Sequence, residues 1–187
     1  GTTRIVTLWD QSSSFGVSPE GYSIGTLFSK EQIDLALQEE LTSEQRRIVP
    51  EVDVSGHGTH VAGIACGNGR ASNGKYRGIA YESELVVVKL AEVRSERTAV
   101  SGTARLMEAI DFCIRFALER NQPLALNLSY GTNEGAHNGK SLLETYINTV
   151  VRMAKCVICV GTGNEGVGRK HAGGILEQET VEIELAI

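Results

Sequence analysis

Leu85-Val-Val-Val-Lys-Leu90 is the clearest strand in the sequence. It is rich in β-branched residues and shows little alternation between polar and apolar side chains, as expected when both faces of a strand are covered. Apolar residues at helical spacing continue over 103–120, and Leu124-Ala-Leu-Asn-Leu-Ser129 predicts the next strand. A second helical pattern over 140–155 leads into a strand over 157–161. This order predicts an α/β fold with a parallel sheet and, because crossovers are right-handed, helices on both faces.

The residues before this region predict a further strand and two short helices. Arg4-Ile-Val-Thr-Leu-Trp9 indicates a buried strand that ends at Asp10, and the Ser- and Gly-rich residues 11–28 indicate a loop. Ser29-Lys-Glu-Gln32 is a capping box, with Ser at the cap position and Gln three residues later, so a helix should begin there. Thr42-Ser-Glu-Gln45 has the same form and predicts a cap for a second short helix.

The last residues have a different pattern. Thr180-Val-Glu-Ile-Glu-Leu-Ala-Ile187 alternates strictly between apolar side chains on one face and polar ones on the other, which is typical of a half-exposed antiparallel strand. We therefore expect residues 1–176 to belong to one α/β domain and residues 177–187 to begin an inserted β-rich segment.

The composition argues against several classes of protein. The chain has 187 residues, a net charge of -5 and 41% hydrophobic residues, which is the make-up of a soluble globular domain. Its apolar runs are far shorter than the ~20 residues that a membrane helix needs. The mild acidity gives no electrostatic reason to bind nucleic acid. We expect neither a membrane span nor a nucleic-acid partner.

Two of the four cysteines, Cys156 and Cys159, form a Cys-x-x-Cys pair. Such a pair can be a redox centre or half of a zinc site. The two residues lie in an apolar run, however, and positions three apart on a strand point to opposite faces. We therefore expect them to be small buried hydrophobic residues.

Polar residues stand after the predicted strands, at the edge where an α/β sheet binds its ligands. Asp10 ends the first strand, Ser129 ends the strand after Pro123, and Asn164 comes after the last one. His57 opens a helix of small residues that is entered through glycines. An Asp, a His and an Asn amide at one sheet edge suit acyl transfer, because a His can take a proton from a nucleophile while an Asp fixes its tautomer. The Asn amide can donate a hydrogen bond to the developing oxyanion.

Ser55-Gly-His-Gly-Thr-His-Val-Ala-Gly63 matches the His motif of the subtilisin-like serine proteases, the subtilases. Asn127-Leu-Ser-Tyr-Gly131 resembles their substrate-binding strand, and Val160-Gly-Thr-Gly-Asn-Glu-Gly166 resembles their oxyanion segment. The resemblance extends up to about Gly174. It implies the N-terminal portion of a three-layer subtilisin-like fold, so residues 1–176 would be part of a subtilase catalytic domain. Leu8-Trp-Asp-Gln11 is similar to a subgroup from anaerobic bacteria that includes spore-germination proteases.

The resemblance also implies roles for individual residues. His57 would be the general base, Asp10 its partner, and Asn164 the side-chain donor to the oxyanion. Substrate-binding residues would be Ser129, Gly131 and Gly163, along the backbone of an extended peptide. The reaction implied is hydrolysis of a peptide bond, through an acyl-enzyme, in a peptide or protein substrate.

The chain departs from the subtilase pattern in two places. Asp10 is followed by Gln11 and Ser12, where the family usually has Ser or Thr and then Gly. No Gly-Thr-Ser nucleophile motif occurs, and no serine comes after Asn164. Two explanations stay open: the chain is a fragment that lacks the nucleophile, or it is a catalytically inactive pseudoprotease or scaffold. The alternating pattern of residues 180–187 favours the fragment, which alone should be inactive and should self-associate through this segment or an unpaired sheet edge.

Other interpretations of these residues are weaker. Asp53 is a rival for the triad acid, although its loop position favours a bracing role. Gly161-Thr-Gly-Asn-Glu-Gly166 is formally a dinucleotide fingerprint, but residues 167–174 are too rich in glycine for the helix that a nucleotide-binding domain requires. We predict no metal site and no cofactor; many subtilases bind calcium, but the sequence shows no Asp-rich ligand spacing. A secreted, cell-envelope or spore-associated location in a bacterium fits the resemblance.

Overall fold

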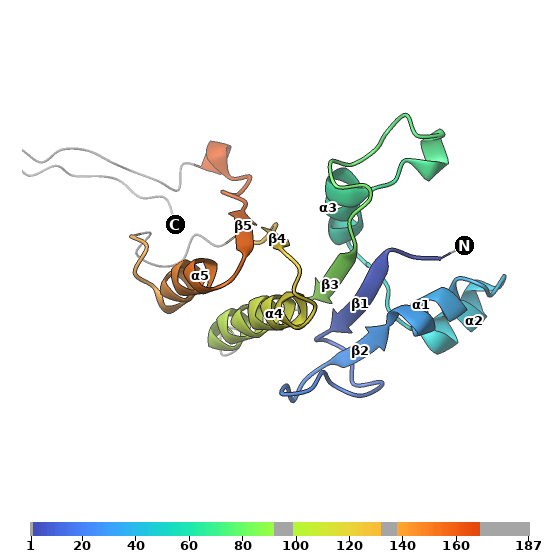
Figure 1. The fold of residues 1–187 in the computed structure, drawn as a ribbon, viewed down its shortest axis with the longest axis horizontal. Helices are drawn as coiled ribbons and strands as arrows, with labels where there is room; N and C mark the ends of the chain where they lie inside the picture. Colours follow the sequence, from blue (N-terminus) through green and yellow to red (C-terminus); the bar gives the residue numbers. More distant parts are fainter. Residues whose placement is uncertain (1, 92–98, 132–137, 169–187) are drawn as a thin grey trace, which may run out of the picture. The chain divides into compact units, whose positions relative to one another are not determined.

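The computed structural model describes residues 2–91, 99–131 and 138–168. The chain divides into two compact units, Gly1–Leu124 and Ala125–Ile187. Each unit combines strands with helices, and Figure 1 shows their elements in chain order from blue to red. The predicted α/β class is confirmed. Residues 177–187 lie outside the described residues, so the boundary at 177 and the strand expected over 180–187 stay predictions.

The sheet of the first unit has three strands in the order β2-β1-β3. The central strand β1 (Ile5–Asp10) runs parallel to β3 (Leu85–Lys89), with Asp10 opposite Lys89 in the register. Strand β2 (Thr26–Ser29) pairs with β1 in the antiparallel direction. The expectation that all of 11–28 is a loop is therefore wrong at its end, where Thr26 and Phe28 are buried against β1. The short stretch shows no alternation long enough to have indicated a strand.

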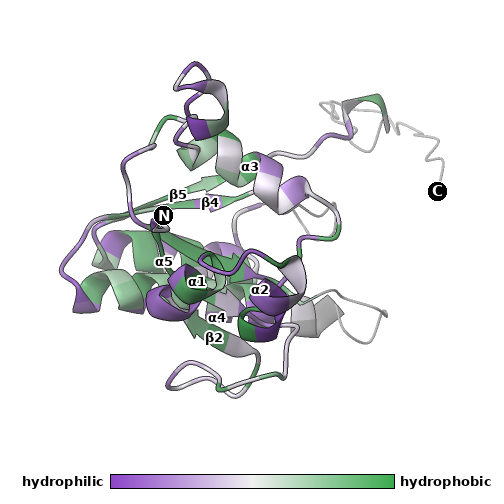
Figure 2. Ribbon diagram, turned by 90° about the vertical axis from the view of Figure 1, so that its right-hand side faces the viewer, coloured by the Kyte–Doolittle hydropathy of each residue, from purple (hydrophilic) through white to green (hydrophobic). Residues whose placement is uncertain are grey.

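Two short helices come after β2. Helix α1 (Lys30–Ala36) begins at the predicted capping box: the Ser29 hydroxyl accepts from the Gln32 amide, and the Gln32 side chain accepts from the Ser29 amide at 2.9 Å. Helix α2 (Thr42–Ile48) has Leu41 at the cap position and no side-chain cap, so the predicted cap at Thr42 is wrong. Figure 2 colours α2 mainly as hydrophilic, which agrees with its lack of buried residues.

Helix α3 (His57–Cys66) begins where the sequence predicts it. Gly56 precedes it in the left-handed conformation, at a φ of 75°, which a residue with a side chain rarely adopts. A 3₁₀ turn, η1 (Arg70–Ser72), lies beyond the end of the helix. The glycine at position 56 therefore lets the chain turn sharply and start a helix with His57 as its first residue.

Helix α4 (Ala99–Glu119) supplies most of the core of the first unit and begins four residues before the predicted start. Trp9 on β1 is fully buried, with its ring centroid 4.9 Å from that of Tyr22 and 5.1 Å from that of Phe112 on α4. The Trp9 indole nitrogen donates to the Ile24 carbonyl at 3.0 Å. Other buried apolar residues are Phe28, Ile33, Ala36, Leu106, Ala109, Ile110, Cys113, Ile114 and Ala117. This core fixes β1, and with it the position of Asp10.

The second unit begins inside strand β4 (Leu124–Leu128), after its first residue, and also contains β5 (Cys156–Val160), the neighbour of β4 in a two-stranded sheet. Helix α5 (Leu142–Met153) lies between them in the chain and begins at a complete capping box of Ser141 and Glu144. A 3₁₀ turn, η3 (Gly166–Gly168), comes after β5. These elements agree with the strand, helix and strand predicted for this part of the sequence.

All four cysteines are free thiols. Cys156 is half-buried and Cys159 is exposed, so the expectation that both are buried is wrong. Burial raises the pKa of the Cys113 thiol to about 12, which keeps this core residue protonated and unreactive at neutral pH. Among the described residues, no helix is both long and apolar enough to cross a membrane.

Candidate active site

Asp10 lies at the carboxyl end of β1 and is only 4% exposed. One of its carboxylate oxygens accepts hydrogen bonds from the Ser12 amide at 2.8 Å and from the Ser12 hydroxyl at 2.6 Å. Ser12, at a position where the resemblance leads to an expectation of glycine, therefore holds the Asp10 carboxylate. The position of Asp10 is that of a functional residue in an α/β sheet, where ligands bind beyond the carboxyl ends of the strands.

Glu51 and Lys89 share this end of the sheet with Asp10. The Lys89 ammonium lies 2.8 Å from one Glu51 oxygen and donates to the other at 3.0 Å, and it also donates to the Val52 carbonyl at 2.9 Å. The Glu51 carboxyl is in turn hydrogen-bonded to the Asp10 carboxyl. A carboxyl pair with one ammonium group therefore occupies the end of the β1–β3 ladder.

The surroundings of this cluster shift the pKa values of the two carboxyl groups in opposite directions. Burial and the hydrogen bond to Asp10 raise the pKa of Glu51 to about 7, against the opposing effect of Lys89. Burial also raises the pKa of Asp10, but the hydrogen bonds with Glu51 and Ser12 and the charge of Lys89 outweigh it and hold the pKa below its usual value. Below about pH 7, the proton of this pair is therefore on Glu51 and the negative charge on Asp10.

His57 is the first residue of α3 and is exposed. Its amide donates to the Ser55 hydroxyl at 3.2 Å, and within the described residues its imidazole makes no hydrogen bond. No hydrogen bond joins His57 to Asp10 in this part of the chain, because the described side-chain partners of Asp10 are Ser12 and Glu51. The structure thus positions the two residues in one unit without pairing them.

Asp53 organises the loop that leads to His57. One oxygen of Asp53 accepts from the Gly56 amide at 2.8 Å, and the other accepts from the amide and hydroxyl of Thr59 at 2.7 and 2.6 Å. The hydrogen bonds with Thr59, followed by those with Gly56 and Ser55, lower the pKa of Asp53 to about 2. Asp53 therefore braces the first turn of α3, as the sequence favours, and is not a partner of the imidazole.

Replacing Asp53 with Ala should loosen the first turn of α3. Amide hydrogen exchange at Gly56 and Thr59 should become faster, while the control Glu39→Ala, at an exposed carboxylate outside this loop, should leave it unchanged. Because the pKa of Asp53 is depressed on folding, its stabilisation is present above the unfolded value of about 3.9 and is lost as the pH falls towards 2. If the amide of Thr59 exchanged its hydrogen at the same rate in Asp53→Ala and in the unmodified chain, Asp53 would not hold the turn.

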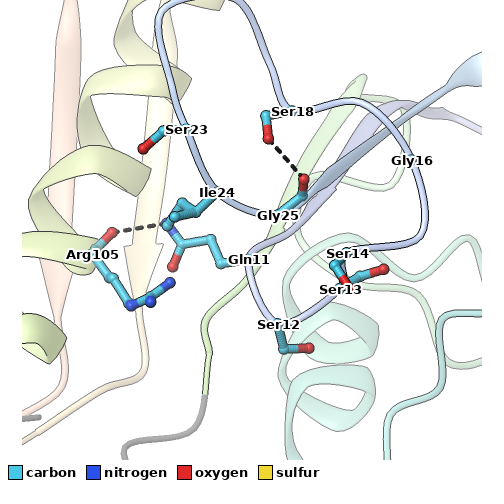
Figure 3. Close-up of a pocket in the computed structure, with 10 residues that line it drawn as sticks. All are labelled: Gln11, Ser12, Ser13, Ser14, Gly16, Ser18, Ser23, Ile24, Gly25 and Arg105. Carbon is cyan, nitrogen blue, oxygen red and sulfur yellow. Dashed lines mark hydrogen bonds between the residues drawn. The ribbon is translucent and has the colours of Figure 1, made fainter.

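A polar hollow of about 340 Å³ lies beside the end of β1 (Figure 3). The Gln11 side chain, 4% exposed, donates to the Arg105 carbonyl at 2.9 Å, and its buried amide oxygen has no hydrogen-bond partner among the described residues. The Ser18 hydroxyl donates to the Gly25 carbonyl at 3.0 Å across the rim. The lining residues are Gln11, Ser12, Ser13, Ser14, Gly16, Ser18, Ser23, Ile24, Gly25 and Arg105. This hollow adjoins Asp10 through Gln11 and Ser12.

The predicted substrate-binding residues of the second unit lie at the adjoining ends of β4 and β5. The Gly161 amide donates to the Leu128 carbonyl at 3.0 Å, so the two strand ends are side by side. An added Cβ at Gly131 would lie 4.0 Å from the Gly163 Cα, and Gly163 itself has a φ of 91°. The left-handed conformation of Gly163 is one that residues with a side chain rarely adopt, so glycine permits the chain to turn there. The structure therefore brings Gly131 and Gly163 together.

Ser129 and Asn164 are exposed at the same strand ends. The Asn127 amide group donates to the Ser129 hydroxyl at 2.9 Å, while Asn164 comes after Gly163 in a bend. An exposed amide and exposed strand-end backbone are the groups that an extended peptide could pair with. Among the described residues, no three His, Cys, Asp or Glu side chains are grouped so that they could hold a metal ion.

Glu51 and Lys89 were not predicted from the sequence. Lys89 carried a signal, because a lysine inside the apolar run 85–90 is rarely buried without a partner. Its partner could not be identified in the same way, since Glu51 is 38 residues earlier and lies in no regular pattern.

The comparisons with known proteins agree on one family. The sequence model of the Subtilase family matches residues 25–183, which include His57 and Asn164 and begin after Asp10. Serine protease AprX from Bacillus subtilis is 31% identical over 119 residues, which cover 61% of this chain and 26% of that protein.

A solved structure gives the same result. The chain resembles the Clostridium perfringens CspB protease with a TM-score of 0.71 and 41% sequence identity, over 88% of this chain and 31% of that one. The chain thus spans about a quarter to a third of the length of these two relatives. With most of its residues matched by the family model and a similar fold, the chain belongs to the subtilase family of serine proteases.

Proposed function

We propose that this chain contributes the base, its acidic partner and the oxyanion donor to a serine endopeptidase. The observation that carries the proposal is the His motif of a subtilase placed on α3, where Gly56 and Asp53 present His57 at the exposed start of the helix. The substrate would be a peptide or protein. AprX and CspB are themselves called proteases, which supports the same activity for the protein that contains this chain.

The proposed reaction proceeds through an acyl-enzyme. His57 takes the proton of a serine hydroxyl as its oxygen attacks the carbonyl carbon, and Asp10 stabilises the imidazolium that forms. Asn164 donates a hydrogen bond to the oxyanion. The imidazolium then gives its proton to the leaving amine. A water molecule, deprotonated by His57, then attacks the ester carbonyl, and the imidazolium returns that proton to the serine oxygen as the ester C–O bond breaks and the acid product leaves.

Asp10 is suited to this role by its charge and place. It is ionised near neutral pH because its pKa is held below the usual value of an aspartate, and Ser12 occupies only one of its oxygens. Its pairing with the imidazole requires His57 to turn towards the end of β1. His57 is exposed at the start of α3, and the described side chains make no hydrogen bond that would hold its imidazole in another position.

Gly131, Gly163 and Ser129 would bind the backbone of the substrate. The exposed strand ends of β4 and β5 offer main-chain groups to an extended peptide, and Gly131 and Gly163 place no side chain in its way. The turn η3 after the Gly-rich segment is a single 3₁₀ turn, whereas dinucleotide binding needs an α-helix there. Proteolysis therefore accounts for these residues better than nucleotide binding.

The nucleophile would come from a serine that is not among these 187 residues, because the Gly-Thr-Ser motif does not occur in them. The competing proposal is a pseudoprotease, in which the same fold has kept its other catalytic groups without a nucleophile. A fluorophosphonate probe separates the two, since it labels only an activated serine.

We expect the protein that contains this chain to be labelled by the probe on one serine and to hydrolyse a peptide ester. The 187-residue chain alone should remain unlabelled, which makes it the matched control. Mass spectrometry of the labelled peptide identifies the serine. A complete protein that folds, binds peptide and takes up no label would be the pseudoprotease.

A further inference from the structure

Glu51 is held from two sides in the segment between α2 and α3. Its side chain is 13% exposed, and both of its oxygens contact the Lys89 ammonium, at 2.8 and 3.0 Å. Lys89 also donates to the Val52 carbonyl, which fixes the backbone beside Glu51. A largely buried carboxyl with an ion pair on one side is costly to place there unless its other contacts are satisfied.

The other contact of Glu51 is the Asp10 carboxyl. Asp10 and Lys89 are partners in the β1–β3 register, and the Gln11 amide donates to the Lys89 carbonyl at 3.0 Å, so the backbone holds the two side chains at one strand end. Two carboxylates and one ammonium would carry an uncompensated negative charge. Two adjacent carboxyl groups avoid this by sharing a proton.

We propose that Glu51 is a positioning residue for Asp10: its carboxyl donates a hydrogen bond to the Asp10 carboxylate, and its ion pair with Lys89 keeps that donor in place. The part of Glu51 in catalysis rests on the proposed function. The inference that Glu51 and Asp10 share a proton rests only on the cluster of Asp10, Glu51 and Lys89. Ser12 holds the Asp10 carboxylate from the loop side. Glu51 holds it from the segment before α3, so the carboxylate is fixed from two directions.

The shared proton makes the hold on Asp10 depend on pH. The charged groups in this cluster are Asp10 from β1, Lys89 from β3 and Asp53 from the loop before α3, which acts on Lys89. Because the pKa of Glu51 is raised to about 7, Glu51 loses its proton as the pH rises through neutrality. The donor to Asp10 is then lost and two carboxylates repel each other, so the hold on Asp10 weakens above pH 7.

The test compares Glu51→Gln with Glu51→Ala in the active protein that contains this chain. Gln keeps a donor to Asp10 at every pH, so the ratio of kcat in Glu51→Gln to kcat in the unmodified enzyme should rise as the pH passes through about 7. Ala removes the donor and should lower kcat by up to about 100-fold, with KM little changed. Glu82→Gln, at an exposed carboxylate, is the control. A kcat ratio that does not vary with pH would overturn the proposal.

Carboxyl ¹³C NMR tests the shared proton without any need for activity. Asp10 should titrate in two coupled steps in the unmodified protein and in a single step in Glu51→Gln. If the coupled steps are present and the complete protein hydrolyses nothing, the proposed function is wrong and Glu51 still positions Asp10. If Asp10 titrates identically in both proteins, the inference about Glu51 is wrong, whatever the enzyme does.

Discussion

Replacing His57 with Ala should lower kcat for peptide hydrolysis by about 10⁶-fold, the loss seen when the base of a subtilisin triad is removed. The reason is chemical: without the imidazole, nothing takes the proton of the serine hydroxyl during attack, and nothing returns a proton to the leaving amine. KM should change little, because the groups proposed to bind substrate lie on other elements.

The measurement is kcat and KM for a peptide ester with the complete protein, together with the rate of fluorophosphonate labelling. His60→Ala is the matched control: His60 lies on the same helix, is also exposed and is given no part in proton transfer. Its kcat should stay within about tenfold of the unmodified enzyme. If His57→Ala kept a kcat in that range, the base would have to be another residue and the assignment of the His motif would fail.

The sequence predicts well those features that depend on neighbouring residues. The capping box at Ser29 and the helix start at Gly56 result from local hydrogen bonding and from the conformational freedom of glycine, and the structure agrees with both. The spacing of apolar residues indicated α4 and α5, because the period of a helix is also set by residues that are close in the sequence. Thr42 shows the limit of a local motif, because the residue that resembles a cap lies inside the helix instead.

Features that depend on distant contacts were beyond the sequence. Strand β2 exists because Thr26 and Phe28 pair with Asp10 and Leu8 of β1, and its four residues are too few to show alternation. The ion pair joins Glu51 to Lys89, which are 38 residues apart in the sequence. The family resemblance pointed to Asp10 and His57, but it gave no sign of Glu51, whose hydrogen bond is the largest of the effects that lower the pKa of Asp10.

The position of Asp10 depends in turn on the residue before it. Trp9 is fully buried between Tyr22 and Phe112, and the Tyr22 hydroxyl donates to Asp111 at 2.7 Å, which ties the loop after β1 to α4. Gly25 permits this arrangement, because a Cβ there would lie 2.5 Å from both the Asp10 carbonyl oxygen and the Trp9 indole nitrogen. The aromatic cluster and the end of β1 are thus one packed feature.

Replacing Trp9 with Ala should therefore lower the free energy of unfolding by about 3–5 kcal/mol, the usual cost of emptying the site of a large buried aromatic residue. The substitution leaves a cavity between Tyr22 and Phe112 and takes the donor away from the Ile24 carbonyl. Trp9→Phe, which keeps a ring but not the indole N–H, should lose less. Because many domains are stable by only about 5–15 kcal/mol, the loss in Trp9→Ala is large enough to populate unfolded chains at moderate temperature.

Urea unfolding followed by circular dichroism measures the effect, since Trp9 is the single tryptophan and its fluorescence disappears with the substitution. Tyr76→Ala is the control, because that aromatic ring is 72% exposed and its removal should change stability by no more than about 0.5 kcal/mol. A Trp9→Ala protein within about 1 kcal/mol of the unmodified one would show that the cluster around Trp9 does not stabilise the fold. Asp10 would then owe its position to Ser12, Glu51 and the β-ladder, and Trp9→Ala should leave the coupled titration of Asp10 intact.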